Sequence, residues 1–403
     1  MDADAARLAA SPEGLALLES LPPYGSINAL TLGAQLRERG ADPALVSVVL
    51  TQARLRAAAE PKFGAFAKGM LFTPAGLEQA TRFTVAARHA ARFRDAGITR
   101  VADLTTGIGA DVMAFAALGM GAIAFERDEA TALIADYNLR HWPEVSVVHA
   151  DSLATLSSGS LDVEGVFADP ARRTTHGRRH DPRDYEPPLD AVLALRERFP
   201  ALGVKVGPGI PHASIPVSSK RAPLEAQWVS VDGDVVEAAL WSGPLAQTPG
   251  NSALVLRAGV AHELHGRTEH ADVGALGEWI LEPDGAVIRS SLIGELAART
   301  GTRLIDPTIA YLTSDTLVET PFATPFRVLD AVPYNERAVA SALKARGVGI
   351  LEIKKRGIDV APEALRRRLK LSGDGSATLI LTRVLGKRMA LIAQRDATPS
   401  TPT

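Results

Sequence analysis

The sequence predicts an α/β protein in which a central, mostly parallel sheet follows a helical region and precedes a basic α+β segment. Three observations support this fold class. Residues Val101–Leu118 read as a strand, a glycine turn and a helix. Three further predicted strands each end in an acidic residue, at Glu126, Asp151 and Asp169. Residues 336–395 alternate helix and strand patterns and carry 14 Lys and Arg against five Asp and Glu, a net charge of +9.

The composition is that of a globular protein without disulfides. The 403 residues leave room for about two to four domains, and 46% of them are hydrophobic, with a net charge of −2 for the whole chain. The absence of cysteine excludes disulfides, thiolate zinc sites and cysteine nucleophiles. The first residues lack a basic segment followed by an apolar one, and no apolar run approaches the roughly 18 residues of a membrane span. We therefore expect a soluble, cytoplasmic protein that has no membrane partner.

Residues 1–72 are predicted to form a helical N-terminal region. Ser11-Pro12 and Asp42-Pro43 each place a capping residue before a proline at the first helical position. Thr73-Pro74 repeats the pattern and begins a helix that is expected to run to Gly97. That helix leads into the glycine-containing strand, and residues 73–243 are predicted to form one α/β domain.

The glycine turn at Gly107 and Gly109 indicates a nucleotide-binding strand–turn–helix unit. Glycines allow the backbone to approach a ligand closely, and the following helix presents unpaired N–H groups. A dinucleotide fingerprint needs a third glycine three residues later, but that position is Val112, so a nicotinamide oxidoreductase is disfavoured. Asp103 and Asp111 make the turn acidic, which suits a cationic or zwitterionic ligand.

The segment Asp103–Gly109 resembles motif I of class I S-adenosylmethionine-dependent methyltransferases, Asp-x-Thr-x-Gly-x-Gly, and Glu126 resembles their motif II acid. The resemblance implies a Rossmann-like, seven-stranded sheet and S-adenosylmethionine as cofactor. In that family, Glu126 would hold the ribose, and Asp151 with Ser152 the adenine. The cofactor-binding residues implied are Asp103, Thr105, Gly107, Ile108, Gly109, Glu126, Arg127, Asp151 and Ser152.

Asp169-Pro170-Ala171-Arg172 resembles motif IV of amino-methylating enzymes, Asn/Asp-Pro-Pro-aromatic. There, a side-chain oxygen and a backbone carbonyl orient the target amine, which implies that Asp169 and the Pro170 carbonyl are the catalytic groups. The segment departs from the motif because Ala171 replaces the second proline and Arg172 the aromatic residue. RNA uracil-5 methyltransferases are a closer match, but they need a cysteine nucleophile, so their chemistry is excluded.

Basic residues in two segments indicate an RNA partner. Arg172, Arg173, Arg178 and Arg179 follow motif IV, where they could contact phosphates or form only an exposed basic loop. Lys354, Lys355, Arg356, Arg366, Arg367 and Arg368 lie in residues 326–395. That segment resembles the THUMP-like domain found after the catalytic domain of some bacterial methyltransferases, which implies RNA binding. Docking of this basic face on acidic parts of the same chain is the alternative.

The remaining segments are less informative. A hairpin with Asp232-Gly233 at its tip closes the predicted sheet near Trp241. Residues 244–325 are expected to form an α+β connecting region, and residues 396–403 a disordered tail. His262, His265 and His270 lie close in sequence, but no cysteine accompanies them and no metal site is expected.

The sequence therefore predicts a methyltransferase that acts on tRNA or rRNA, at a base nitrogen. Two alternatives remain open: a non-catalytic RNA-binding protein that keeps the cofactor fold, and a methyltransferase of a small molecule. The latter leaves the basic segment unexplained. Neither the methylated nucleotide nor the oligomeric state follows from the sequence.

Overall fold

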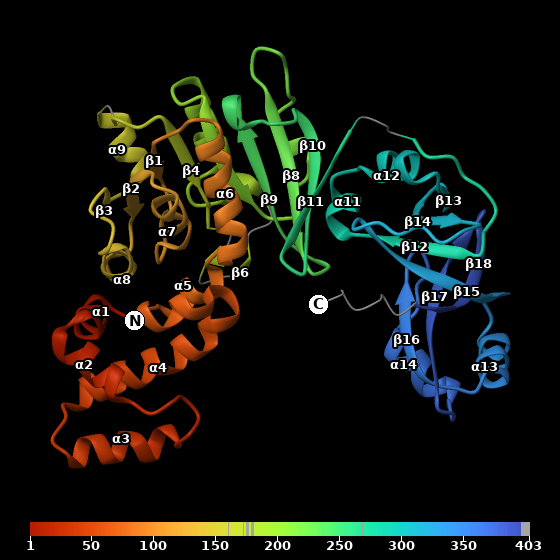
Figure 1. Cartoon of the computed structure of the whole chain (residues 1–403), viewed down its shortest axis with the longest axis horizontal. Helices are drawn as coiled ribbons and strands as arrows, with labels where there is room; N and C mark the ends of the chain where they lie inside the picture. The colour runs from red at the N-terminus through yellow and green to blue at the C-terminus, as the bar shows by residue number, and fades with distance from the viewer. Residues whose placement is uncertain (160, 172, 175–176, 179–180, 267–269, 396–403) are drawn as a thin grey trace. The chain divides into compact units, whose positions relative to one another are not determined.

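A computed structural model describes residues 1–159, 161–171, 173–174, 177–178, 181–266 and 270–395 (Figure 1). The predicted tail at residues 396–403 lies outside these ranges. The chain divides into two compact units: the first comprises Met1–Leu224 and Ala239–Gln247, the second Glu225–Ala238 and the chain from Thr248 onward. Within the described residues, no helix has both the length and the apolar character needed to cross a membrane.

The first unit begins with a helical region, red and orange in Figure 1, as the sequence predicts. The Ser11 hydroxyl accepts a hydrogen bond of 3.0 Å from the backbone N–H of Gly14, and the Asp42 carboxylate one of 2.9 Å from that of Leu45. Both are N-caps followed by proline at the first helical position. The elements are α1 (Ala3–Ala10), α2 (Pro12–Ser20), α3 (Ala29–Glu38), α4 (Pro43–Phe63) and the 3₁₀ helix η1 (Gly64–Gly69).

The helix expected from Thr73 to Gly97 is two helices, α5 (Pro74–Gln79) and α6 (Phe83–Asp95). The break falls at Ala80, whose backbone turns to an extended ψ of 140°. The ammonium of Lys62 explains the break, because it donates hydrogen bonds to the backbone carbonyls of Leu77, Glu78 and Ala80. A continuous helix would have used those carbonyls as acceptors for its own N–H groups. The three residues at the break, Ala80, Thr81 and Arg82, include no proline or glycine that would signal it.

Five parallel strands make up the sheet of the first unit, in the order β3-β2-β1-β4-β7, with β9 next to β7. Because the five are parallel, their carboxyl ends meet at one edge. The strands are β1 (Arg100–Asp103), β2 (Gly121–Glu126), β3 (Val145–His149), β4 (Gly165–Ala168) and β7 (Ala201–Val206). The intervening helices are α7 (Ala110–Ala117), α8 (Glu129–Leu139), α9 (Ser152–Ser158) and α10 (Leu189–Ala194).

The hairpin predicted around Asp232-Gly233 joins β8 (Leu224–Val231) to β9 (Asp234–Ser242). Two strands that the sequence did not predict as part of the sheet follow, β10 (Gly250–Arg257) and β11 (Val260–His265). β10 pairs in parallel with β8, so the sheet has nine strands instead of the seven expected. The addition covers what would otherwise be the exposed edge of β8.

The second unit contains a sheet in the order β13-β14-β12-β15-β18-β17-β16. The expected domain boundary at residue 326 falls inside β15, so the connecting region and the basic segment share this sheet. The strands are β12 (Trp279–Pro283), β13 (Arg303–Asp306), β14 (Ile309–Ser314), β15 (Ala323–Pro333), β16 (Val348–Lys355), β17 (Gly375–Val384) and β18 (Lys387–Gln394). The helices are α11 (Gly285–Arg289), α12 (Ile293–Thr300), α13 (Glu336–Ala345) and α14 (Pro362–Leu369).

Candidate functional site

A cavity of about 470 Å³ opens at the carboxyl edge of the parallel strands, within the ~300–1,000 Å³ usual for small-molecule sites. Residues at and after the ends of β1, β2, β3 and β4 line it, together with six residues of the segment 73–81 and with residues 186–188. Eight of the predicted catalytic and cofactor-binding residues are in its lining: Thr105, Gly107, Ile108, Glu126, Arg127, Asp151, Ser152 and Asp169. Asp103, Gly109 and Pro170 are buried and are not in the lining.

The glycine turn after β1 has a left-handed backbone at both of its glycines. Gly107 and Gly109 have φ angles of 57° and 93°, where a side chain would be strained. Asp103 is only 2% exposed, and its carboxylate accepts the backbone N–H of Thr105 at 3.0 Å. Burial, reinforced by the nearby charges of Asp111, Asp169 and Glu126, raises the pKa of the Asp103 carboxyl well above its usual range. The buried Asp103 therefore stabilises the backbone conformation of the glycine turn.

Glu126, at the end of β2, is placed to hold a diol. One carboxylate oxygen accepts the backbone N–H of Gly107 at 3.0 Å, and the other accepts that of Asp128 at 2.8 Å. A carboxylate has about four acceptor positions, so each oxygen can accept a further hydrogen bond from a ribose hydroxyl. Burial raises the pKa of Glu126 above its usual value. Its neighbour Arg127, predicted to bind cofactor, forms an ion pair with Glu186 across the cavity rim.

Asp151 and Ser152 lie after β3, where the adenine of the cofactor is expected. The Asp151 carboxylate caps α9 by accepting the backbone N–H of Ala154 at 2.9 Å, and Ser152 is buried. The acidic glycine turn, the Glu126 carboxylate and the pair Asp151–Ser152 therefore surround one cavity. This set of acceptors fits S-adenosylmethionine, which carries a positive sulfonium, an amino group and two ribose hydroxyls.

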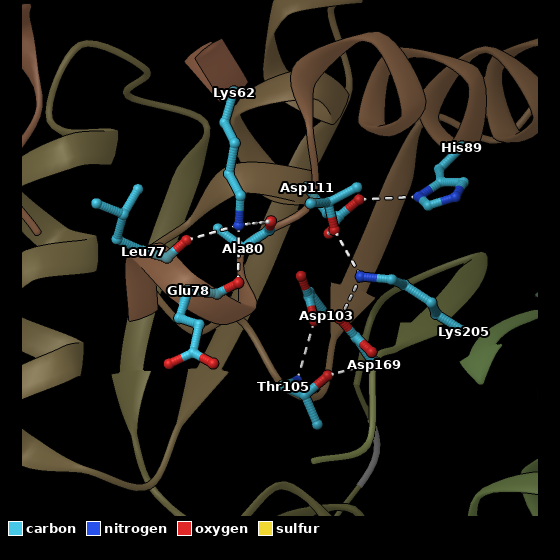
Figure 2. A network of polar contacts seen from close by, with 11 residues as sticks. Lys62, Leu77, Glu78, Ala80, His89, Asp103, Thr105, Asp111, Asp169 and Lys205 are labelled. Atoms are coloured by element: carbon cyan, nitrogen blue, oxygen red, sulfur yellow. Dashed lines mark hydrogen bonds and ion pairs between the residues drawn. The ribbon is translucent and has the colours of Figure 1, made fainter. Parts of the chain in front are cut away.

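Asp169, at the end of β4, is held from two sides (Figure 2). Its backbone N–H donates to the Thr105 hydroxyl at 2.6 Å. Its carboxylate pairs with the ammonium of Lys205 from β7 at 2.6 Å, and Lys205 is itself only 7% exposed. The carboxylate thus has a fixed position in the cavity beside the glycine turn. Pro170, which follows, is buried, and Ala171 pairs with Glu186 through two backbone hydrogen bonds.

Lys205 belongs to a chain of polar contacts that reaches helix α6 (Figure 2). Its ammonium donates to the Thr81 hydroxyl at 2.9 Å, and that hydroxyl donates to Asp111 at 2.7 Å. The other Asp111 oxygen lies 2.9 Å from Nδ1 of His89. Burial alone would raise the pKa of Asp111, but the hydrogen bond and charge of His89, helped by Lys205 and Thr81, bring it below its usual value.

Sequence patterns do not single out Thr81, His89 or Lys205. The one local signal is a charged residue inside the apolar strand segment Gly203–Val206. The carboxyl-edge position of Lys205 follows from the strand order, which the sequence gives only through its resemblance to a known fold. His89 approaches Asp111 through the packing of α6 on α7, and Thr81 approaches it from the segment between α5 and α6.

The predicted RNA-binding residues differ in the contacts that they make within the protein. Arg172 and Arg179 lie outside the described residues. The backbones of Arg173 and Arg178 are register partners in the two-stranded sheet of β5 (Arg173–Thr174) and β6 (Gly177–Arg178). In the second unit, Lys355 and Arg367 are exposed. The other four contact neighbouring residues: Lys354 pairs with Glu282, Arg356 donates to the Ala310 carbonyl, Arg366 to the Leu351 carbonyl, and Arg368 pairs with Glu336.

Comparison with known proteins gives the same assignment. The chain is 36% identical over 359 residues to an uncharacterized S-adenosylmethionine-dependent methyltransferase of Mycobacterium tuberculosis, found in strains CDC 1551 and H37Rv, and covers 95% of it with 87% of its own length. A crystal structure of a methyltransferase candidate from Porphyromonas gingivalis W83 superimposes with a TM-score of 0.74 at 21% identity, covering 96% of this chain and 98% of that one. That likeness supports the fold.

Two family matches cover the ends of the described chain. Residues 323–395 match the THUMP domain-like family, and residues 2–59 match a domain of unknown function. The first match spans β15 to β18 and confirms the C-terminal resemblance. With the match over nearly the whole length of the tuberculosis relatives and a cavity that fits the cofactor, the chain belongs to the family of S-adenosylmethionine-dependent methyltransferases.

Proposed function

We propose that this methyltransferase modifies RNA, at a nitrogen atom of a base. The observation that carries the proposal is the position of Asp169, whose carboxylate lies in the cofactor cavity and is held there by Lys205. A carboxylate at this place accepts hydrogen bonds, so it suits an acceptor that carries N–H groups.

The chemistry of transfer needs little from the protein beyond orientation. S-adenosylmethionine supplies an activated methyl group on its sulfonium. Asp169 accepts an N–H of the target base, so that the nitrogen lone pair faces the methyl group; the Pro170 carbonyl, which the motif implies as a second acceptor, belongs to a residue outside the cavity lining. Lys205 and Thr105 keep the Asp169 carboxylate and backbone in place. Such positioning is a large source of rate acceleration in transfer reactions.

The second unit supports RNA as the acceptor. Its residues 323–395 match the THUMP domain-like family, and the net charge of residues 336–395 is +9. Lys355 and Arg367 are exposed, as are Arg337 and Lys344 on α13. Cationic side chains of this kind bind phosphates and release the counterions condensed on a nucleic acid. In the sequence, Arg172, Arg173, Arg178 and Arg179 follow Asp169 closely and would add phosphate contacts.

Tritium transfer from S-adenosylmethionine to fractionated cellular RNA, followed by nucleoside analysis, tests the proposal. We expect label in tRNA or rRNA as an N-methylated base. The Asp169→Ala variant should lose transfer and bind S-adenosylhomocysteine as the wild type does, because its carboxylate serves the acceptor. Asp162→Ala, a change of an exposed carboxylate before β4, is the matched control.

Two results would contradict the proposal. Loss of S-adenosylhomocysteine affinity in Asp169→Ala would make Asp169 a cofactor residue. Label that enters small metabolites, while every RNA fraction remains unlabelled, would assign the enzyme a small-molecule acceptor.

A further inference from the structure

Residues Met70–Thr81, here called the strap, run between helix α4 and the glycine turn of the cofactor site. Two side chains of α4 bind its first part. Gln52 donates to the Phe72 carbonyl at 2.7 Å and accepts the Phe72 N–H at 2.9 Å, and Arg56 donates to the Met70 carbonyl at 2.8 Å. All these bonds join side chains of the N-terminal helical region to backbone atoms of the strap.

Asn138 of α8 holds the strap from the opposite side. It exchanges two hydrogen bonds with the backbone of Leu71, at 2.8 and 3.0 Å, and donates a third, at 2.9 Å, to the carbonyl of Ile108 in the glycine turn. Gly76 lies so close to this turn that a Cβ there would be 2.4 Å from Cγ2 of Ile108. The strap is therefore bound on one side by α4 and pressed against the cofactor loop on the other.

Lys62, near the end of α4, binds the last part of the strap (Figure 2). Its ammonium donates to the backbone carbonyls of Leu77 at 2.7 Å, Glu78 at 2.7 Å and Ala80 at 3.1 Å. An ammonium has three N–H donors, so these bonds use its full capacity. Burial, followed by the positive charges of Lys205 and Arg82, lowers the pKa of Lys62.

The strap forms one wall of the cofactor cavity. Thr73, Ala75, Gly76, Gln79, Ala80 and Thr81 all line it. Three of these residues lie at or beyond the carbonyls that Lys62 binds. Without Lys62, the carbonyls of Leu77 and Glu78 could accept N–H groups of a lengthened α5, and residues 79–81 would leave their present backbone path.

We propose that Lys62 is a positioning residue that fixes the strap as the wall of the cofactor site, and that the N-terminal helical region thereby sets how long S-adenosylmethionine stays bound. Helix α4 begins within the segment that matches a domain of unknown function, residues 2–59; Gln52 and Arg56, which bind the first part of the strap, lie in that segment, and Lys62 lies just beyond it. The proposal depends on the identity of the cofactor alone and is independent of whether RNA is the acceptor.

Calorimetry and stopped-flow dissociation with S-adenosylhomocysteine test the proposal without any methyl acceptor. Lys62→Met keeps the apolar stem and removes the ammonium. We expect it to weaken binding about ten-fold or more, mainly through faster dissociation, because the bound state must then order the residues that Lys62 holds in the wild type. Lys62→Arg should restore part of the affinity. Lys68→Met, a change of an exposed lysine in η1, should leave binding unchanged.

Hydrogen exchange separates positioning from general stabilisation. In Lys62→Met the amides of residues 77–83 should exchange faster, and those of β1 and β2 at the wild-type rate. If Lys62→Met lowers the melting temperature but leaves the affinity, the dissociation rate and this local exchange unchanged, the proposal is wrong. If Lys62→Met does not fold, Lys62→Gln, which keeps two N–H donors, takes its place and is judged by the same two outcomes.

Discussion

The pair Lys205–Asp169 allows a test of how the acceptor side of the site is built, through the substitution Lys205→Met. Methionine has a similar length and removes the charge. The Lys205 side chain is 9% exposed and that of Asp169 27%, so the change takes the ammonium donor away from a carboxylate and from the Thr81 hydroxyl in a mostly buried place. Breaking a buried ion pair by removing one partner costs about 3–5 kcal/mol.

The expected loss for Lys205→Met is smaller than that range. Water reaches the partly exposed Asp169 carboxylate and replaces part of the lost interaction, so we expect the free energy of unfolding to fall by about 2–3 kcal/mol. Urea denaturation measures it, with the midpoint falling and the slope unchanged. Methyl transfer should fall about 100-fold, since a misplaced catalytic group has that effect on rate.

A double-mutant cycle with Asp169→Asn identifies the cause of this loss. In the Asp169→Asn background the ammonium of Lys205 keeps the Thr81 hydroxyl and the nearby charge of Asp111 but has lost its paired carboxylate, so removal of Lys205 should cost less there than in the wild type. The coupling energy should be about 1.5–3 kcal/mol. If Lys205→Met destabilises both backgrounds equally, the reasoning is refuted, because the lysine would then act by packing alone. The measurement needs no substrate.

Three further predictions concern the cofactor, the buried acid and the basic surface. Glu126→Ala should weaken S-adenosylhomocysteine binding about ten-fold or more in calorimetry, since hydrogen bonds to a charged group contribute about 1.5–3 kcal/mol; unchanged affinity would place the ribose elsewhere. Asp103 has a raised pKa in the folded protein, so its contribution to stability is present below its ordinary value of 3.8 and is lost as the pH rises through the folded pKa. Asp103→Asn, which keeps the acceptor for Thr105, should therefore gain stability relative to the wild type in urea denaturation as the pH is raised from about 4 toward 7; a constant difference would mean that Asp103 is ionised when folded. Replacing Lys355 and Arg367 with Gln should flatten the slope of log K against log salt for single-stranded RNA by about 1.4, at roughly 0.7 per phosphate contact. Arg368→Gln, which breaks the pair with Glu336, should lower the melting temperature and leave that slope unchanged.

The local chemistry of the cofactor site follows from the sequence by itself. A strand, two glycines and a helix form within the span Val101–Leu118, and the structure has β1, the turn and α7 there. The spacing of 19 residues between Gly107 and Glu126 places their contact at adjacent strand ends. In a parallel sheet, an acid at the end of a strand reaches the common carboxyl edge, so the cavity-lining positions of Glu126, Asp151 and Asp169 follow from pattern alone.

Contacts between distant segments were decided only by the tertiary structure. Lys205 meets Thr81 across 124 residues and Asp169 across 36, and Lys62 meets Ala80 across 18 through a helix break that no local residue signals. The two added strands β10 and β11 likewise depend on the open edge of β8. Hydrogen-bond partners of this kind depend on which elements pack together. Periodicity and motif spacing indicate which residues of one helix or strand are buried, but they do not indicate which other element packs against it. The acidic residues of the site could therefore be identified from the sequence. Lys205, which holds Asp169, and Lys62, which holds the strap, could be found only in the folded protein.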